Sequence, residues 1–233
     1  VILLERDRRP GTRATGRISG EGGTWSRMAQ LRFLAHAVIR NADAGRFDKA
    51  REVTDEMGSY ISALQKNEPK GSLAAPFAEL MTLRAESKIA LSRGDAAAAR
   101  DIGAEMIAWL QGLNADNESD RVWKFALTFM ANDVKAQSEL ALRDFGAAEE
   151  SARAALSAKD QWKVDPRTDE RVKAGISTMI ALALVGQGKA VEAREVIEPV
   201  IEFHRSLARK NRGDQIQKVE MAAAIYAAAL ADP

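Results

Sequence analysis

The sequence predicts an all-α fold, and three observations support that prediction. From Ser26 onward, apolar residues recur every three or four positions, which is the period of a helix with one buried face. No stretch shows the sustained alternation of a half-buried strand, and Ala, the best helix former, is abundant throughout. With 46% hydrophobic residues among 233, the chain can also bury a substantial core.

Turn-forming residues divide the periodic stretch into about nine helices. Three longer interruptions, at residues 67–71, 114–117 and 163–166, contain Asn, Gly, Pro or Asp and are typical of loops. Between these loops lie pairs of helices that are joined by much shorter turns. The predicted helices span residues 26–43, 46–66, 75–93, 95–112, 119–142, 145–158, 168–186, 189–211 and 214–231.

The short turns repeat one pattern. Gly45, Gly94 and Gly188 stand where a helix is expected to end, because glycine adopts the positive φ that closes a helix. Arg143 stands at the equivalent place in the third turn. An Ala follows five residues later in every case, at Ala50, Ala99, Ala148 and Ala193. The turns are 49, 49 and 45 residues apart, which is a spacing typical of stacked helical hairpins.

These units resemble the tetratricopeptide repeat family over residues 26–211. The matching residues are Ile180, Ala181, Leu184, Gly188, Ala193 and Pro199 in the fourth unit, and Leu34, Ala37, Val38, Gly45 and Ala50 in the first. The resemblance implies antiparallel helix hairpins that stack into a right-handed superhelix. The family period is about 34 residues, however, and unit two carries polar Glu86 and Ser87 where core residues are expected. We therefore expect divergent repeats with long helices.

The chain is expected to contain a short arm and one helical domain. Residues 1–25 are rich in Arg, Gly and Thr, and the first forty residues hold eight Arg against three acidic residues. This composition is typical of a linker, or of a basic arm that binds phosphates or an acidic protein face. The repeat domain covers residues 26–233, with units at about 26–66, 75–112, 119–158 and 168–211. Residues 214–231 are expected to form a capping helix or the first half of a further unit.

Composition argues against several classes of function. The chain has no cysteine, which excludes disulfides, thiolate metal sites and cysteine nucleophiles, and its two histidines alone cannot form a histidine-rich metal centre. It contains no P-loop, dinucleotide-binding glycine pattern, nucleophile elbow or zinc-protease motif. We therefore expect no catalytic residue, no metal and no cofactor.

Charge and hydropathy argue against nucleic acid as a partner and against insertion into a membrane. The net charge is +1, with no nucleic-acid-binding motif, which argues against a nucleic-acid partner. The longest strongly apolar stretch, Met221 to Ala231, is about half of the roughly 20 residues that span a bilayer, so no membrane insertion is expected. No targeting peptide is recognisable, which favours the cytoplasm and leaves the periplasm open. The Ala- and Arg-rich composition resembles that of a high-GC bacterium.

The resemblance also implies where a ligand binds. In the tetratricopeptide family the first helix of each hairpin lines the concave groove, and the matching positions here are Arg32, Arg84, Lys88, Asp133, Gln137 and Thr178. Arg84 and Lys88 are four residues apart on one helical face, and with Arg32 they would form a basic end of the groove for a carboxylate or an acidic peptide. The Asn residues of the family's carboxylate clamp are absent at the matching positions, so a solvated helix face stays the alternative.

The function we expect is a non-enzymatic scaffold that binds a protein or peptide, as part of a larger bacterial polypeptide. The alternative is a regulatory or sensor domain that controls an attached enzyme or DNA-binding domain. An all-α enzyme whose site leaves no sequence motif is a third hypothesis.

Overall fold

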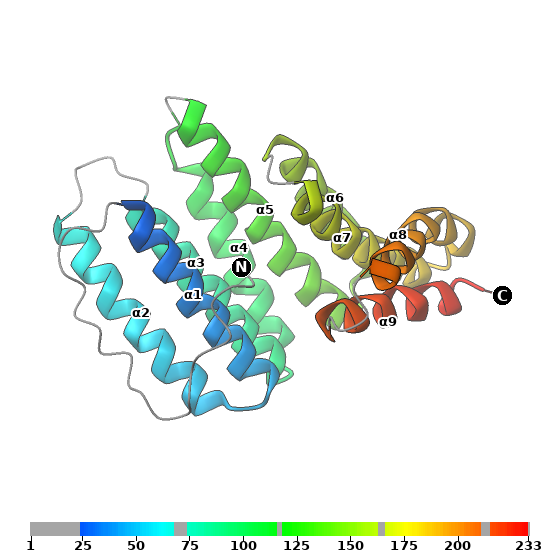
Figure 1. The fold of residues 1–233 in the computed structure, drawn as a ribbon, viewed down its shortest axis with the longest axis horizontal. Coiled ribbons are helices and arrows are strands. Elements are labelled where there is room, and N and C mark those ends of the chain that lie inside the picture. The colour runs from blue at the N-terminus through cyan, green and yellow to red at the C-terminus, as the bar shows by residue number, and fades with distance from the viewer. Residues whose placement is uncertain (1–23, 68–73, 116–117, 163–165, 211–214, 233) are drawn as a thin grey trace.

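The computed structural model describes residues 24–67, 74–115, 118–162, 166–210 and 215–232, and these residues form nine α-helices and no strand (Figure 1). The helices are α1 (Thr24–Asp43), α2 (Phe47–Asn67), α3 (Ala74–Ser92), α4 (Ala96–Gln111), α5 (Glu118–Ala141), α6 (Phe145–Gln161), α7 (Pro166–Gly186), α8 (Ala190–Lys210) and α9 (Gln215–Leu230). The all-α prediction is confirmed. The expected arm at residues 1–25 lies outside the described residues except for its last two.

The helices form two rows. Each helix packs against the next one along the chain, and the odd-numbered helices also pack against each other in sequence, α1 with α3, α3 with α5, α5 with α7 and α7 with α9. Within the described residues no two even-numbered helices are in contact. The odd-numbered helices therefore form one continuous row, which we call the odd row. The even-numbered helices form a second row, whose described members do not touch one another. In Figure 1, α1 and α2 lie at one end of the long axis and α9 reaches the other.

Four tight turns join the hairpins α1–α2, α3–α4, α5–α6 and α7–α8, and all four have the same backbone geometry. Gly45, Gly94 and Gly188 have φ of 69°, 83° and 77°, and Arg143 has φ of 61°. The N–H of each of these residues donates to the carbonyl three residues earlier at 2.9–3.1 Å. The N–H of the following residue donates to the carbonyl five residues earlier at 2.8–2.9 Å. These two bonds define a Schellman motif, so the predicted equivalence of the four turns is confirmed.

Small residues bring the two helices of each hairpin together. Ala50, Ala99, Ala148 and Ala193, each five residues after the turn, are at most 1% exposed. Seven residues further along, the side chains are again buried, at Met57, Met106, Ala155 and Val200. The repeat seen in the sequence is therefore also a repeat of buried positions.

One buried position of the repeat is apolar in the first two hairpins and polar in the last two. Sixteen residues after the turn, the first two hairpins carry the apolar side chains Ile61 and Leu110, which are 7% and 4% exposed. The third and fourth hairpins carry Lys159 and His204 there, at 0% and 1% exposed. A buried Lys requires a partner, and the Lys159 ammonium donates to the Asp169 carboxylate on α7 and, at 2.7 Å, to the carbonyl of residue 162. The junction between α6 and α7 is thus partly ionic.

Candidate functional site

Four of the residues expected in the groove come together in one hollow of the odd row. Arg84 and Lys88 on α3 lie opposite Asp133 and Gln137 on α5, around a cavity of about 100 Å³. We call it the α3–α5 hollow. Among the described residues its lining is Ile39, Arg84, Ser87, Lys88, Leu91, Asp133, Val134 and Gln137. The mixture of aliphatic, cationic, amide and carboxylate groups suits a polar ligand with some apolar surface.

Carboxylates balance the two cations of the α3–α5 hollow. The Arg84 guanidinium lies 3.5 Å from the Asp133 carboxylate, and the Lys88 ammonium lies 3.1 Å from that of Asp43 on α1. The Gln137 amide also donates to Asp133, at 3.1 Å. The expected basic end of the groove is therefore close to neutral. Its charged groups are paired across three helices of the odd row.

Ser87 is a member of the hollow that the family positions do not include. The residue is 0% exposed, and its hydroxyl oxygen has no hydrogen-bond partner within the described residues. A buried hydroxyl without a partner costs free energy. One sequence signal points to this residue, since Ser87 is polar at a core position of the repeat that is Val38, Ala136 or Ala181 in the other units.

Of the other two expected groove residues, Thr178 lies outside the hollow. Thr178 on α7 is 7% exposed, and its hydroxyl donates to the Ala174 carbonyl at 3.0 Å, so its hydrogen-bonding capacity is used within its own helix. The backbone of Arg32 lies within α1, but its side chain is outside the described part of the structure.

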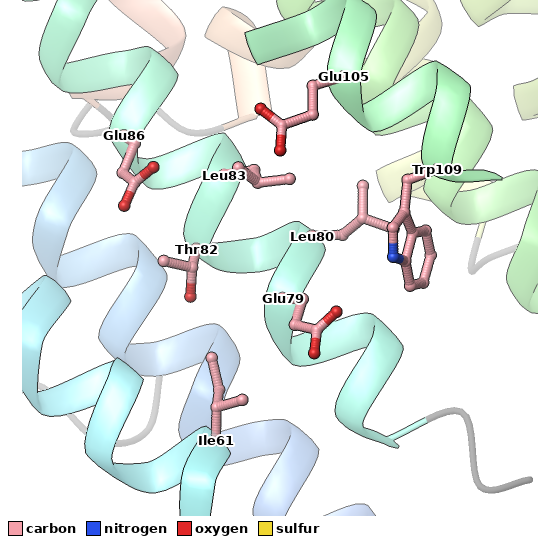
Figure 2. A pocket seen from close by; sticks show the side chains of 8 residues that line it. All are labelled: Ile61, Glu79, Leu80, Thr82, Leu83, Glu86, Glu105 and Trp109. Atoms are coloured by element: carbon pink, nitrogen blue, oxygen red, sulfur yellow. The ribbon is translucent and has the colours of Figure 1, made fainter. Parts of the chain in front are cut away.

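A second, larger hollow opens on the even side of α3 (Figure 2). Its volume is about 310 Å³, and its lining comes from α2, α3 and α4: Ile61, Glu79, Leu80, Thr82, Leu83, Glu86, Glu105 and Trp109. Figure 2 shows α3 crossing the hollow, with Ile61 on one side and Glu105 and Trp109 on the other. Partial burial and the nearby Glu105 carboxylate together raise the pKa of Glu86. The hollow is therefore apolar with an acidic rim.

Neither hollow has acidic or histidine side chains arranged as a metal centre among the described residues. Among the residues that the structure describes, no group of three or more His, Asp or Glu side chains is arranged to hold a metal ion. The same part of the chain contains no helix with the length and apolar character that would span a membrane.

The fold and the two hollows define a class of protein, an all-α chain of repeated helical hairpins with hollows between its helices. Comparisons with protein-family models, curated proteins and solved structures found no significant match to this chain.

Proposed function

We propose that this chain is a non-enzymatic protein- or peptide-binding module, folded as a right-handed superhelix of tetratricopeptide-like hairpins. Four equivalent turns and the continuous row of odd-numbered helices support the superhelix. Stacked hairpins of this kind present side chains from successive units along one surface. A ligand that binds there meets groups already held in place by helix packing, which limits the conformational entropy lost on binding.

The α3–α5 hollow is the observation that carries the proposal. It combines paired charges with a buried hydroxyl that has no partner in the described residues. Lys88 and Asp43 are 30% and 53% exposed, and an exposed ion pair of this kind contributes at most about 1 kcal/mol. An acidic side chain of a peptide can therefore take the place of Asp43 beside Lys88. The amide of Gln137, which is partly exposed, offers a hydrogen bond to the peptide.

Selection from a displayed peptide library with the 233-residue chain tests the proposal. We expect selected peptides to contain an acidic residue, and R84A/K88A to weaken their binding by about tenfold or more in calorimetry, as for the loss of a charge-assisted contact. The control is R153A/K189A, because both cations pair with Glu149 and lie away from the hollow. The proposal is wrong if no peptide is selected, or if the two double variants bind the selected peptides equally.

A further inference from the structure

The larger hollow lies on α3, between α2 and α4 (Figure 2). Leu80 and Leu83 of α3 line it, with Ile61 of α2 on one side and Trp109 of α4 on the other. Leu83 and Trp109 are partly buried and pack against the hydrophobic core, so their positions are fixed before a ligand binds. The volume of about 310 Å³ is near the lower limit, roughly 300 Å³, of pockets that enclose a whole small molecule. The hollow therefore suits one or two side chains of a longer ligand.

The charged side chains that line the larger hollow are all acidic. Glu79, Glu86 and Glu105 contribute three carboxylates, and the described lining contains no Lys, Arg or His. Glu79 and Glu86 are seven residues apart, which is about two turns, so they share one face of α3. Arg84 and Lys88 lie on the opposite face, where they pair with carboxylates of the α3–α5 hollow. Helix α3 is therefore acidic toward one hollow and basic toward the other.

Two of the carboxylates, those of Glu86 and Glu105, repel each other. Both residues reach the surface, and within the described residues neither forms an ion pair or a hydrogen bond. Partial burial and the Glu105 carboxylate raise the pKa of Glu86. A cation beside both carboxylates would offset their repulsion. The repeat does not require a charge here, since the residue equivalent to Glu86 is Ala37 in the first unit and Ile180 in the fourth.

We propose that the larger hollow binds a peptide segment that presents an Arg or Lys side chain next to an apolar residue. The cation of the ligand lies beside Glu86 and Glu105, which supply the complementary charge. Its aliphatic stem lies along Leu83, and the neighbouring apolar side chain packs on Leu80 and the Trp109 indole. This second site has the opposite charge preference to the α3–α5 hollow, and it does not depend on the function proposed for that hollow.

Titration of the isotope-labelled 233-residue chain with acetyl-Leu-Arg-Leu-amide, followed by NMR, tests the site. We call this probe the arginine peptide. The chain has four Trp, so W109F is used to assign the indole N–H signal of Trp109, which we expect to shift during the titration. In a second probe citrulline replaces arginine, which keeps the shape of the side chain and removes its charge. We expect the citrulline peptide to bind about tenfold more weakly or worse, as for the loss of a charge-assisted contact.

Two pairs of glutamate substitutions test which carboxylates bind the cation. E86Q/E105Q keeps the size of both side chains and removes their charge, and we expect it to weaken binding of the arginine peptide by about tenfold. The matched control is E192Q/E195Q, because Glu192 and Glu195 are also exposed and their helix, α8, contacts only α7 and α9 among the described helices. It changes the net charge by the same amount, so a general attraction between peptide and protein would weaken equally. Circular dichroism checks that each variant is folded.

R84A/K88A separates this site from the α3–α5 hollow. It removes the two cations on the opposite face of α3, and we expect it to bind the arginine peptide as tightly as the wild type does. Conversely, E86Q/E105Q should bind acidic peptides selected for the α3–α5 hollow like the wild type.

Four outcomes would overturn the proposal. They are a Trp109 indole signal that does not shift at millimolar arginine peptide, equal affinity for the arginine and citrulline peptides, and equal binding by E86Q/E105Q and E192Q/E195Q. The fourth is tighter binding of butylguanidinium than of the arginine peptide, because the site would then be one for a free organic cation and not for a peptide.

Discussion

At the scale of single residues, Arg143 is under backbone strain that the other turns avoid. Its φ is 61°, in the left-handed region where glycine stands in the three equivalent turns. A side chain with a Cβ costs roughly 1–2 kcal/mol there. Its N–H still donates to the Leu140 carbonyl at 3.1 Å, so the turn forms despite the strain. The packing of the repeat holds Arg143 in this conformation.

Replacing Arg143 with Gly should stabilise the protein. We expect R143G to raise the free energy of unfolding by about 0.5–1 kcal/mol, because the relief of strain exceeds the extra entropy that glycine has in the unfolded chain. The measurement is urea denaturation followed by circular dichroism. R143A is the control, since it removes the guanidinium and keeps the strained φ. Equal stabilisation by R143A and R143G would show that the side chain, and not the backbone, is responsible.

The sequence predicts neighbours along one helix much better than neighbours between helices. The position of Arg143 and the shared face of Arg84 and Lys88 followed from spacing alone. The acidic partners of those two cations did not, because Asp43 and Asp133 lie on α1 and α5 and reach them only after the odd row has packed. The prediction of a basic groove end was incomplete for this reason.

At the scale of elements, the junction of α6 and α7 depends on a buried ion pair. Lys159 is fully buried and donates to the Asp169 carboxylate, and this hydrogen bond is the main reason that the pKa of Asp169 is lowered. The Lys173 ammonium, 3.2 Å from Asp169, lowers that pKa further. The pKa of Asp169 is lower in the folded protein than in the unfolded chain, where it is near 3.8. The ion pair therefore stabilises the folded protein at pH values above 3.8. That contribution is lost as the pH falls through the lower, folded-state pKa.

Removing one member of this pair should destabilise the protein more than removing both. We expect D169N to lower the free energy of unfolding by about 2–3 kcal/mol at pH 7, because it leaves the Lys159 ammonium buried without its counter-charge. The double variant K159M/D169N should recover most of the loss, since the equivalent core positions in the first two hairpins are Ile61 and Leu110. The measurement is a denaturant titration of D169N, K159M and the double variant.

The pH dependence provides a second readout of the same pair. Between pH 5 and pH 2, roughly the range over which a carboxyl with a lowered pKa titrates, the wild type should lose more stability than D169N. If both proteins lose stability in parallel over this range, Asp169 does not contribute through its charge. The ion pair would then be structurally dispensable.

At the scale of the whole molecule, most of the features that could be predicted from the sequence follow from its helical repeat. Nine helices, four hairpin turns and the buried Ala after each turn follow from local spacing, and the described residues contain all of them. The larger hollow in Figure 2 could not be predicted in this way. It exists because α2 and α4 do not touch each other, which is a property of how hairpins stack and not of any one segment.

The same stacking should make stability depend on position along the chain. Met57 on α2 and Met106 on α4 occupy the same place in the repeat, and both are 0% exposed. Helix α2 contacts only α1 and α3 among the described helices, whereas α4 contacts α3 and α5 and thus joins the first two hairpins to the rest of the row. In a linear array each unit is stabilised by its neighbours, so a cavity in the second unit affects units on both sides.

We expect M57A and M106A to have different effects on native-state hydrogen exchange. Each truncation removes a buried side chain, at a cost of about 2–5 kcal/mol. M57A should speed exchange in α1, α2 and α3 and leave α5 to α9 unchanged, because only neighbours of the first hairpin lose packing. M106A should speed exchange from α1 through α5, since the first hairpin also loses the support of the second. If M57A instead speeds exchange uniformly as far as α9, the protein unfolds as one cooperative unit and its stability is not a sum over hairpins.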